Sequence, residues 1–589
     1  MDDKRNWITA LLLSAAILLG WSFVSDKFFP TPPKPDVTKT VAGAPGAAPA
    51  ATPGVPAIPQ AGGTPATAAP AVQPVQSVDA ALAAGNRIPI ETPTIKGSIN
   101  LVGARIDDIT LTKYRQTIKK DSPAVRLFAP GNTKSAYFAS IGWSIQNATP
   151  AQLALLPNQS SVWTATGTKL TPTTPVTLNW SNGAGQSFRI EYSIDEDYLI
   201  TAKQTMVNAG TAPLTTSSYA LIDRLGKPTD PHEQDSWTTH VGPTGFLDAK
   251  STYTNYGEIE EAPGRKISYG SGAWLGFTDK YWLAAIIPAK GERISASMTS
   301  PQANNYQMMF ARDFAQLAPG QQITTTSRIF AGAKEVSVLE NYTDNLGINR
   351  LSHAIDWGWF DFFEIPIFKL LDWLFKQVGN FGVAIMVLTL IIRLLMFPIA
   401  QRQFHSMAQM RLVQPKMKAL QERYKDDKQK QQQELMKLYK DEKINPLAGC
   451  LPILIQIPIF YALYKVLMLT IEMRHQPFIL WIKDLSAQDP AMILNLFGYL
   501  KFTPPSLLSI GVMAVILGIT MWLQFRLNPP PTDPVQAQVF KIMPWMFMFI
   551  MAPFAAGLLL YWITNNCLSI AQQQWMYRKF PALRTAAAK

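Results

Sequence analysis

The residues IMPWMFMFIMAPFAAGLLLYWITNNCLSIAQQQWMY, at positions 542–577, contain no charged side chain over 36 positions. A single α-helix of that length would extend about 54 Å, whereas the hydrocarbon core of a bilayer is about 30 Å thick. The chain must therefore turn back within this stretch, and Pro553 and Gly557 are suited to the break. The stretch predicts two membrane-spanning helices, the first of which extends back to Val535.

Four further runs of the chain are apolar enough to cross a bilayer, which takes about 20 residues. Residues 7–24 hold no charge and follow Lys4 and Arg5, which predicts an uncleaved anchor. A cleaved signal peptide is the alternative, although the run is longer than a usual signal core. Only Arg393 interrupts a second run. The six predicted spans are 7–24, 381–400, 447–466, 506–525, 535–552 and 555–575.

The distribution of charge predicts the orientation of these spans. Of the 589 residues 16% are charged, and the net charge is +12; soluble domains usually have about 25% charged residues. Residues 401–445 carry +5 and residues 578–589 carry +4, whereas residues 87–340 carry only +2. Because basic loops stay on the cytoplasmic side of a membrane, both basic pieces are expected inside. This partition favours a topology signal over nucleic-acid binding, and no dedicated DNA-binding function is expected.

With residues 1–6 inside, the exported region has two parts before a helix at the membrane surface. Residues 25–94 are rich in Pro, Ala, Gly and Thr, which predicts an extended linker. Residues 95–340 contain alternating runs such as SFRIEYSI, and SNGAG between two runs is a hairpin signal, so a large all-β sandwich is expected. The aromatic segment 353–378 predicts an amphipathic helix in the outer interface. The remaining connections are exported at 471–504 and cytoplasmic at 401–446, 526–534 and 576–589.

Motifs of known catalytic chemistry are missing from the sequence. It contains no GxxxxGK[ST], HExxH, GxSxG or CxxC pattern. The acidic groups at 195–197 and 258–261 could be imagined as glycosidase carboxylates, but runs of adjacent acids are usually solvated turns. We therefore expect no catalytic residues, no metal site and no cofactor, and the chain is not expected to be an enzyme.

Arg393 is the most informative residue of the predicted spans. An arginine in mid-helix costs on the order of 2.5–3.5 kcal/mol on insertion scales and usually faces a bundle interior or water. No Asp or Glu occurs in a predicted span, and snorkelling of Arg393 to the cytoplasmic interface is the alternative. Other polar residues favour a wet cavity open to the cytoplasm. They are Thr389, one turn from Arg393, Gln456 in the third span, and a stripe on the last span formed by Tyr561, Asn565, Ser569 and Gln572.

The basic loop 401–446 predicts two antiparallel helices joined near Asp426. Its charge is attractive to anionic lipid or ribosomal RNA, and a solvated charged face that only enforces topology is an equal alternative. Methionine makes such a surface adaptable. The residues expected to face one another are Met407, Met410, Leu412, Met417 and Leu420 on the first helix, and Leu435, Met436, Leu438 and Tyr439 on the second.

Several stretches together identify a family resemblance that covers essentially the whole chain. They are TLIIRLLMFPIAQRQF at 389–404, NPLAGCLPILIQIPIFYALY at 445–464, WIKDLSAQDP at 481–490 and PFAAGLLLYWITNNCLSIAQQ at 553–573. With the anchor and the exported domain, they closely resemble the YidC-type membrane protein insertases of the Oxa superfamily, in their Gram-negative form. The resemblance implies a polytopic α-helical protein of the bacterial inner membrane with both termini in the cytoplasm, and a periplasmic supersandwich related to sugar-binding folds.

The resemblance also implies a function and a site. It implies insertion and folding of nascent membrane proteins, alone or with the Sec translocon and ribosomes, through a hydrophilic groove open to cytoplasm and lipid. Arg393 corresponds to the groove arginine of the family, and Thr389, Gln456 and Tyr561 resemble its groove-lining positions, while Trp562 stands where relatives often have a second tyrosine. Two other classes stay open: a solute transporter or channel, and a periplasmic sugar enzyme or scaffold for which the spans are only an anchor.

Overall fold

The computed structural model describes most of the chain from Val75 to Lys579. All described residues belong to the larger of the two units into which the chain divides, residues 56–589. The predicted anchor at 7–24, the linker up to residue 74 and the end of the basic tail lie outside them. The description covers 75–579 except for 229–238, 262–265, 272–273, 426, 443–450, 501, 503, 506–508 and 528–533.

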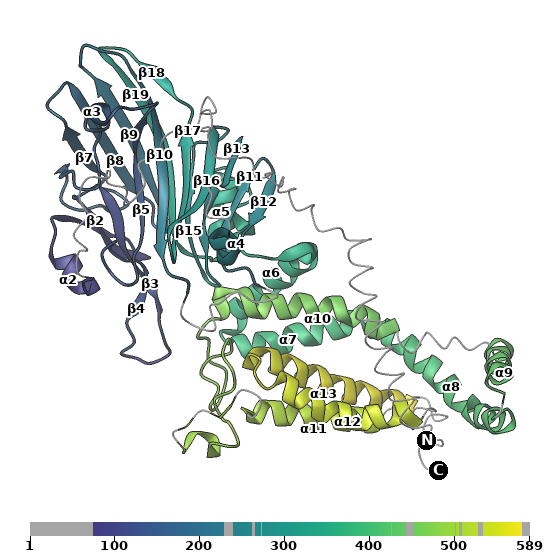
Figure 1. Cartoon of the computed structure of the whole chain (residues 1–589). Coiled ribbons are helices and arrows are strands. Elements are labelled where there is room, and N and C mark those ends of the chain that lie inside the picture. Colours follow the sequence, from purple (N-terminus) through teal and green to yellow (C-terminus); the bar gives the residue numbers. More distant parts are fainter. Residues whose placement is uncertain are drawn as a thin grey trace. The chain divides into compact units, whose positions relative to one another are not determined.

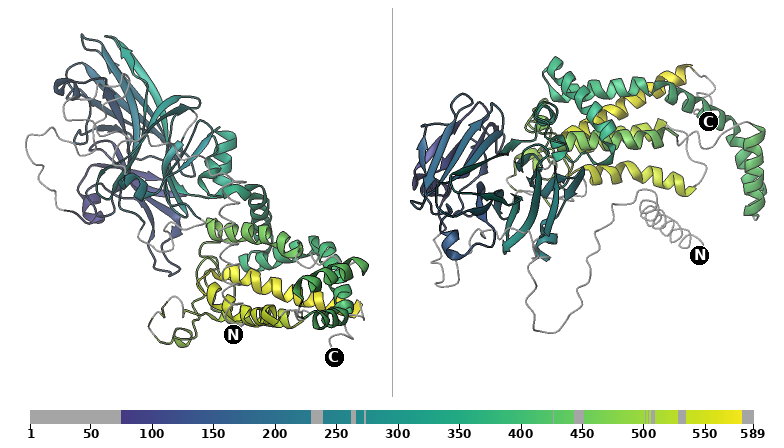
Figure 2. Two further views of the ribbon diagram at one scale, coloured as in Figure 1. Left: turned by 45° about the vertical axis from the view of Figure 1, so that its right-hand side comes forward. Right: turned by 90° about the horizontal axis from the view of Figure 1, so that it is seen from above.

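Two antiparallel β-sheets pack face to face, as the sequence predicts (Figures 1 and 2). The first sheet has the order β1-β2-β3-β5-β10-β17-β16-β13, with β4 beside β3 and β18 beside β10. The strands of this sheet are β1 (Arg87–Glu91), β2 (Ile95–Asn100), β3 (Arg105–Arg115), β4 (Ala124–Phe128), β5 (Tyr137–Ile145), β10 (Leu214–Leu225), β13 (Lys266–Ser271), β16 (Arg293–Gln302), β17 (Asn305–Arg312) and β18 (Ala315–Leu317).

The second sheet has the order β12-β11-β14-β15-β19-β9-β8-β7-β6. Its strands are β6 (Thr164–Thr166), β7 (Val176–Ser181), β8 (Gln186–Ile194), β9 (Leu199–Asn208), β11 (Gly242–Leu247), β12 (Lys250–Tyr253), β14 (Trp274–Thr278), β15 (Trp282–Ile287) and β19 (Gln321–Ala333). Short helices accompany the two sheets at α2 (Val78–Ala83), α3 (Pro150–Leu153) and α4 (Tyr256–Glu261).

Strand β8 shows how the sequence builds this sandwich. Its nine residues alternate strictly between buried and exposed, and Phe188, Ile190 and Tyr192 point into the core. Because side chains alternate across a strand, one face joins the core and the other meets water. The hairpin predicted at SNGAG is present, since β7 and β8 pair antiparallel from Val176 opposite Tyr192 to Ser181 opposite Ser187.

The expectation of a linker over 25–94 is wrong at its carboxyl end. Residues 78–83 form helix α2, capped by the Ser77 hydroxyl, and residues 87–91 form strand β1. Ile88 and Ile90 of β1 are buried in the core of the sandwich. Two isoleucines at alternate positions are enough to bury one face of an edge strand. This short alternation was overlooked because the residues before it are rich in Pro and Ala.

The carboxyl-terminal part of the chain is helical. Helices α7, α10, α11, α12 and α13 run side by side (Figures 1 and 2). In the part of the chain that the structure describes, no helix is both long enough and apolar enough to cross a membrane. The helices are α5 (Val336–Asn345), α6 (Asp361–Val378), α7 (Phe381–Leu395), α8 (Phe397–Arg423), α9 (Lys428–Asp441), α10 (Leu451–Leu469), α11 (Val512–Leu527), α12 (Pro534–Met551) and α13 (Ala556–Lys579).

Two predicted helical segments are interrupted. The segment 381–400 divides at Met396, because Pro398 lies in the first turn of α8, where its missing N–H is tolerated. The segment 353–378 is an α-helix only from Asp361 onward. Before it lie two short 3₁₀ turns, the second beginning at Gly358, whose φ of 71° is a left-handed conformation that favours glycine.

The connection between α10 and α11 joins the helices to the sandwich. The Arg474 guanidinium donates a hydrogen bond of 2.8 Å to the carbonyl oxygen of Arg115 in β3 and lies 5.3 Å from the centre of the Trp282 ring. The carboxylate of Glu472 accepts a hydrogen bond of 3.0 Å from the backbone N–H of Val336, at the start of α5. These contacts connect a loop beside α10 to three elements that precede it by more than 100 residues.

A second set of contacts orders the same connection internally. The Asp489 carboxylate accepts hydrogen bonds from Trp481 Nε1 at 3.0 Å, and from the backbone N–H of Met513 at 2.7 Å. Met513 lies in the first turn of α11, where unpaired N–H groups favour an anion. A Cβ atom at Gly511 would lie 2.7 Å from the Asp489 carboxylate, so glycine is required there.

Burial of Glu472 makes the stability of this junction depend on pH. One carboxylate oxygen of Glu472 has no hydrogen-bond partner, and burial raises the pKa of the group to about 7. The folded protein therefore binds more protons than the unfolded chain between about pH 4.5 and pH 7, and the free energy of unfolding falls as the pH rises through this window. We expect Glu472→Gln to remove this fall and to stabilise the protein above pH 7 by on the order of 2 kcal/mol.

The measurement is the thermal unfolding midpoint of the purified protein in detergent from pH 5 to pH 8. The midpoint of the Glu472→Gln variant should exceed that of the parent by an amount that grows with pH. Glu340→Gln is the control, because Glu340 lies on α5 and pairs with Lys369 at the surface. If the midpoints of the parent and the Glu472→Gln variant change with pH in parallel, Glu472 is not the source of the pH dependence.

Candidate functional site

The Arg393 side chain links α7 to α13. Its Nε donates a hydrogen bond of 2.7 Å to Asn565 Oδ1, and its Nη2 donates one of 2.5 Å to Ser569 Oγ. A longer contact of 3.4 Å runs from Nη2 to the Asn565 carbonyl oxygen. Asn565 and Ser569 lie one turn apart on α13, so one face of this helix presents an amide and a hydroxyl to the same guanidinium.

The charge of Arg393 is not balanced by an acid in the described part of the chain. No Asp or Glu there lies within 4.0 Å of the guanidinium, and its hydrogen-bond acceptors are neutral. Neutral dipoles stabilise a buried cation without cancelling its charge. The site therefore keeps a full positive charge between two largely apolar helices, which attracts an incoming anion.

A second polar contact lies one turn away along α13. Gln456 of α10 donates a hydrogen bond of 2.8 Å from Nε2 to the hydroxyl oxygen of Tyr561, which is almost fully buried. Tyr561 precedes Asn565 by four residues, so the two contacts lie on one face of α13. Through this face α13 is bonded both to α7 and to α10.

Two further residues predicted to line the groove make no hydrogen bond to Arg393 in the described part of the chain. The Thr389 hydroxyl donates to the Ile385 carbonyl oxygen of its own helix at 2.6 Å, and no hydrogen bond joins it to Arg393. Threonine in a helix often satisfies its hydroxyl in this way, which sequence spacing does not reveal. The Trp562 ring packs on Phe460 and Phe547, with ring centres 5.0 and 5.9 Å away, in an apolar cluster beside the polar contacts.

Sequence reasoning missed a polar contact on another face of α13. Asn566 is buried, and its Nδ2 donates a hydrogen bond of 3.2 Å to Thr520 Oγ1 of α11. The sequence did contain a clue to this contact, since Asn566 and Thr520 are polar residues within two predicted spans. Asn566 fell outside the stripe because it follows Asn565 directly and therefore lies about 100° around the helix.

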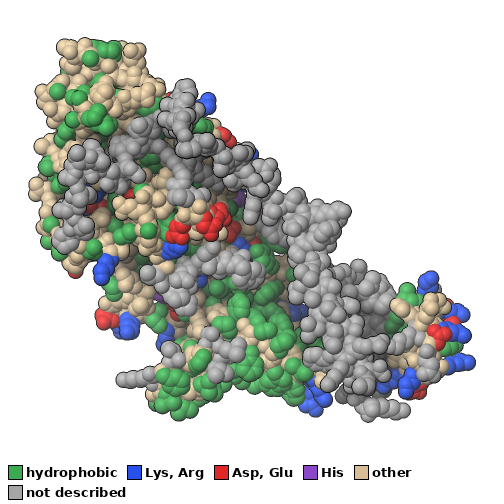
Figure 3. Space-filling view, in the orientation of Figure 1, with side chains coloured by type: hydrophobic (Ala, Val, Ile, Leu, Met, Phe, Trp, Pro, Cys, Tyr) green, Lys and Arg blue, Asp and Glu red, His purple; other side chains and the backbone are tan. Residues whose placement is uncertain are grey.

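Large apolar side chains are exposed around this polar centre. Such side chains gather over the helical part of the molecule in the view of Figure 3. A contiguous exposed apolar surface on this scale is typical of a membrane or interaction surface. It includes Leu394 and Leu395 of α7, Ile519, Trp522 and Leu523 of α11, and Ile542, Trp545 and Phe549 of α12.

The helices α8 and α9 contact each other through a small apolar cluster. Val413 and Met417 of α8 are buried against Leu435, Leu438 and Tyr439 of α9. Val413 was missed, although it precedes Met417 by four residues and so shares its face. The side chains of Met407, Met410 and Leu412 lie outside the described part of the structure.

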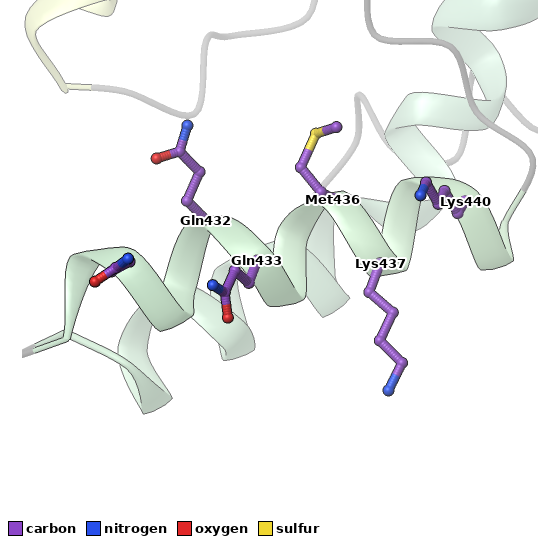
Figure 4. A pocket seen from close by; sticks show the side chains of 6 residues that line it. Gln432, Gln433, Met436, Lys437 and Lys440 are labelled. Carbon is purple, nitrogen blue, oxygen red and sulfur yellow. The ribbon is translucent and has the colours of Figure 1, made fainter.

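Met436 does not oppose α8, contrary to the prediction. It is half exposed and lines a shallow hollow on α9 with Gln432, Gln433, Lys437 and Lys440 (Figure 4). The face toward α8 is formed by residues 435, 438 and 439, and position 436 lies about 100° away from Leu435 around the helix. The hollow therefore combines one flexible apolar side chain with amide and ammonium groups.

Comparison with known proteins identifies the family. Residues 373–583 match the family described as 60Kd inner membrane protein, and residues 87–370 match the YidC periplasmic domain. The membrane protein insertase YidC of Zymomonas mobilis is 45% identical over 98% of this chain and 96% of its own length. The protein of the same name from Methylobacterium nodulans is 44% identical over 98% of this chain and 95% of its own.

A solved structure described as an active YidC insertase with its first transmembrane domain resolved covers 82% of this chain and 91% of its own, at 19% identity and a TM-score of 0.35. The assignment rests on the sequence relatives, whose identity extends over nearly the whole chain and covers both the sandwich and the helices. The chain belongs to the YidC family of membrane protein insertases, inner membrane proteins with a periplasmic domain.

Proposed function

We propose that this insertase moves its substrates along a hydrophilic groove that is open to the cytoplasm and to lipid, with the Arg393 guanidinium as its central charge. The observation that carries the proposal is the hydrogen-bonded but uncompensated cation held by Asn565 and Ser569. Tyr561 and Gln456 extend the polar surface by one turn, and Trp562 supplies an apolar wall beside it. Thr389, one turn before Arg393 on α7, is proposed to line the same groove.

The proposed topology has six spans, with both chain ends and the α8–α9 hairpin in the cytoplasm and the sandwich in the periplasm. The net charges of +5 at 401–445 and +4 at 578–589 support it, since basic segments remain inside. The spans follow the uncharged runs of the sequence. The second span runs across the break at Met396, while the third and fourth include residues outside the described set.

Insertion then proceeds in three steps. A nascent segment with a short acidic tail enters from the cytoplasm, where the α8–α9 hairpin receives its apolar part at the exposed Met436. Met417 and Leu435 pack between α8 and α9 and hold the hairpin together. The Arg393 charge attracts the acidic tail and keeps the groove hydrated, which shortens the low-dielectric path that the tail must cross. The apolar segment moves past the exposed faces of the helices into lipid, and its own transfer free energy drives release.

The proposed partners follow from the same surfaces. Nascent membrane proteins are the substrates, and phospholipids contact the exposed apolar faces of α11 and α12. The ribosome contacts the cytoplasmic hairpin, whose hollow on α9 carries Lys437 and Lys440 beside Met436. For substrates that this protein does not insert alone, the proposed partner is the Sec translocon, as the family resemblance implies.

Removing the charge tests the role of Arg393. We expect Arg393→Ala to lower insertion of a single-span substrate with an acidic tail by roughly tenfold, since hydrogen bonds to charged groups contribute about 1.5–3 kcal/mol. Arg393→Lys should restore most of the insertion, because lysine keeps the charge. The assay measures protease protection of the substrate tail in vesicles reconstituted with purified protein. Full insertion by the alanine variant would rule out this role for the charge.

Neutralising the charge without removing the arginine is a sharper test. The geometry places Asn565 Oδ1 2.7 Å from Arg393 Nε, so Asn565→Asp introduces an acid of nearly the same shape as an ion-pair partner. We expect it to reduce insertion of the acidic-tailed substrate about as strongly as Arg393→Ala.

Ser569→Ala is the matched control, because it removes a hydrogen bond and leaves the net charge of the site unchanged. A substrate whose tail acids are replaced by asparagine should be insensitive to Asn565→Asp. Equal losses with both substrates would point to a structural defect and count against electrostatic attraction.

A further inference from the structure

The connection between α10 and α11 carries an unusual concentration of exposed apolar side chains. Tyr499 is 88% exposed, the highest fraction of any large apolar residue described. We call this group the apolar tip. Its members are Ile493, Leu494, Leu496, Phe497, Tyr499, Leu500 and Phe502, each more than 40% exposed.

The apolar tip is held in place by backbone hydrogen bonds. The N–H of Phe497 donates to the Met492 carbonyl oxygen at 2.8 Å, and the N–H of Leu500 donates to the Asn495 carbonyl oxygen at 3.0 Å. Leu496 and Phe497 have φ angles of 50° and 61°, in the left-handed region that large side chains rarely adopt. Strain of this kind persists where the surrounding structure enforces it, typically at functional positions.

The composition of the segment indicates what it contacts. Lys501 is the only charged residue from position 491 to position 510, and no acid occurs there. Aromatic and aliphatic side chains with an occasional lysine are typical of segments that lie in the boundary between lipid headgroups and acyl chains. A surface made for water would carry mixed charges instead.

The position of the apolar tip also fits the boundary between lipid headgroups and acyl chains. It leads directly into α11, whose residues Ile519, Trp522 and Leu523 continue the exposed apolar surface. A second exposed group, Ile479 to Trp481, lies earlier in the same connection. Asp489 ties the second group to α11, because it binds the Trp481 ring nitrogen and the backbone N–H of Met513. The apolar tip is joined to the chain just before α11 by a hydrogen bond of 3.0 Å from the N–H of Ile493 to the Ile510 carbonyl oxygen.

We propose that the apolar tip inserts into the interfacial layer of the bilayer at the periplasmic surface and anchors the α10–α11 connection there. The occupant of this surface is the phospholipid itself. The inference rests on the proposed topology, which places this connection outside. It concerns a surface apart from Arg393 and does not depend on the groove.

The test uses the full-length protein in vesicles of phosphatidylethanolamine and phosphatidylglycerol. A nitroxide is attached at Tyr499→Cys after replacement of Cys450 and Cys567 by alanine. The control label is at Val162→Cys, since Val162 is an equally apolar, 60% exposed residue of the sandwich. Collision rates with a water-soluble nickel complex and with oxygen are measured by electron paramagnetic resonance.

We expect the nickel collision rate at position 499 to be roughly threefold lower than at position 162, and the oxygen rate to be higher, as for an interfacial depth. Combining Leu494→Ser, Leu500→Ser and Phe502→Ser should return the label at 499 toward the rates at 162, with an unchanged unfolding midpoint in detergent.

Equal nickel rates at 499 and 162 in the parent would overturn the proposal and leave a protein partner as the occupant of the tip. The parent comparison decides the question even if the serine variant fails to fold. The two labels report the depth of the tip in the membrane and not the insertion of substrate proteins. A negative result here is therefore distinguishable from failure of the role proposed for Arg393.

Discussion

A guanidinium placed among apolar helices must be solvated by groups that the protein itself supplies, and the contact between α7 and α13 meets this requirement. Asn565 and Ser569 provide an amide oxygen and a hydroxyl at hydrogen-bond distance from Arg393, without an acid to cancel the charge. In the proposed function, this cation is both retained among the helices and available to attract an anionic substrate. An ion pair would have met the first need and removed the second.

The connections between helices and sandwich depend on acids and arginines placed in loops. Asp489 joins a tryptophan to the first turn of α11, Glu472 binds the first residue of α5, and Arg474 lies on the Trp282 ring. Each side chain satisfies backbone groups that would otherwise stay unpaired where the chain changes direction. The described residues of the 471–513 connection therefore hold two exposed apolar groups in defined positions.

The sequence was sufficient to predict the features that follow from strand and helix periodicity. It did not predict which hydrogen-bond or packing partner an individual side chain would have. Alternation predicted the sandwich and the hairpin at SNGAG, and helical spacing grouped Tyr561, Asn565 and Ser569 on one face of α13. The same spacing placed Thr389 near Arg393, yet its hydroxyl bonds its own helix, and it placed Met436 toward α8, although that residue faces outward. Glu472 and Asp489 were not recognised, because an acid in a loop is usually solvated and only the fold shows what buries it.

Helix α13 is bonded to three neighbours by polar contacts: to α7 through Arg393, to α10 through Tyr561, and to α11 through Asn566 and Tyr577. Helix α13 is thus the common partner through which these polar contacts join α7, α10 and α11. A shift in the position of α13 would therefore act on all three of these helix contacts together.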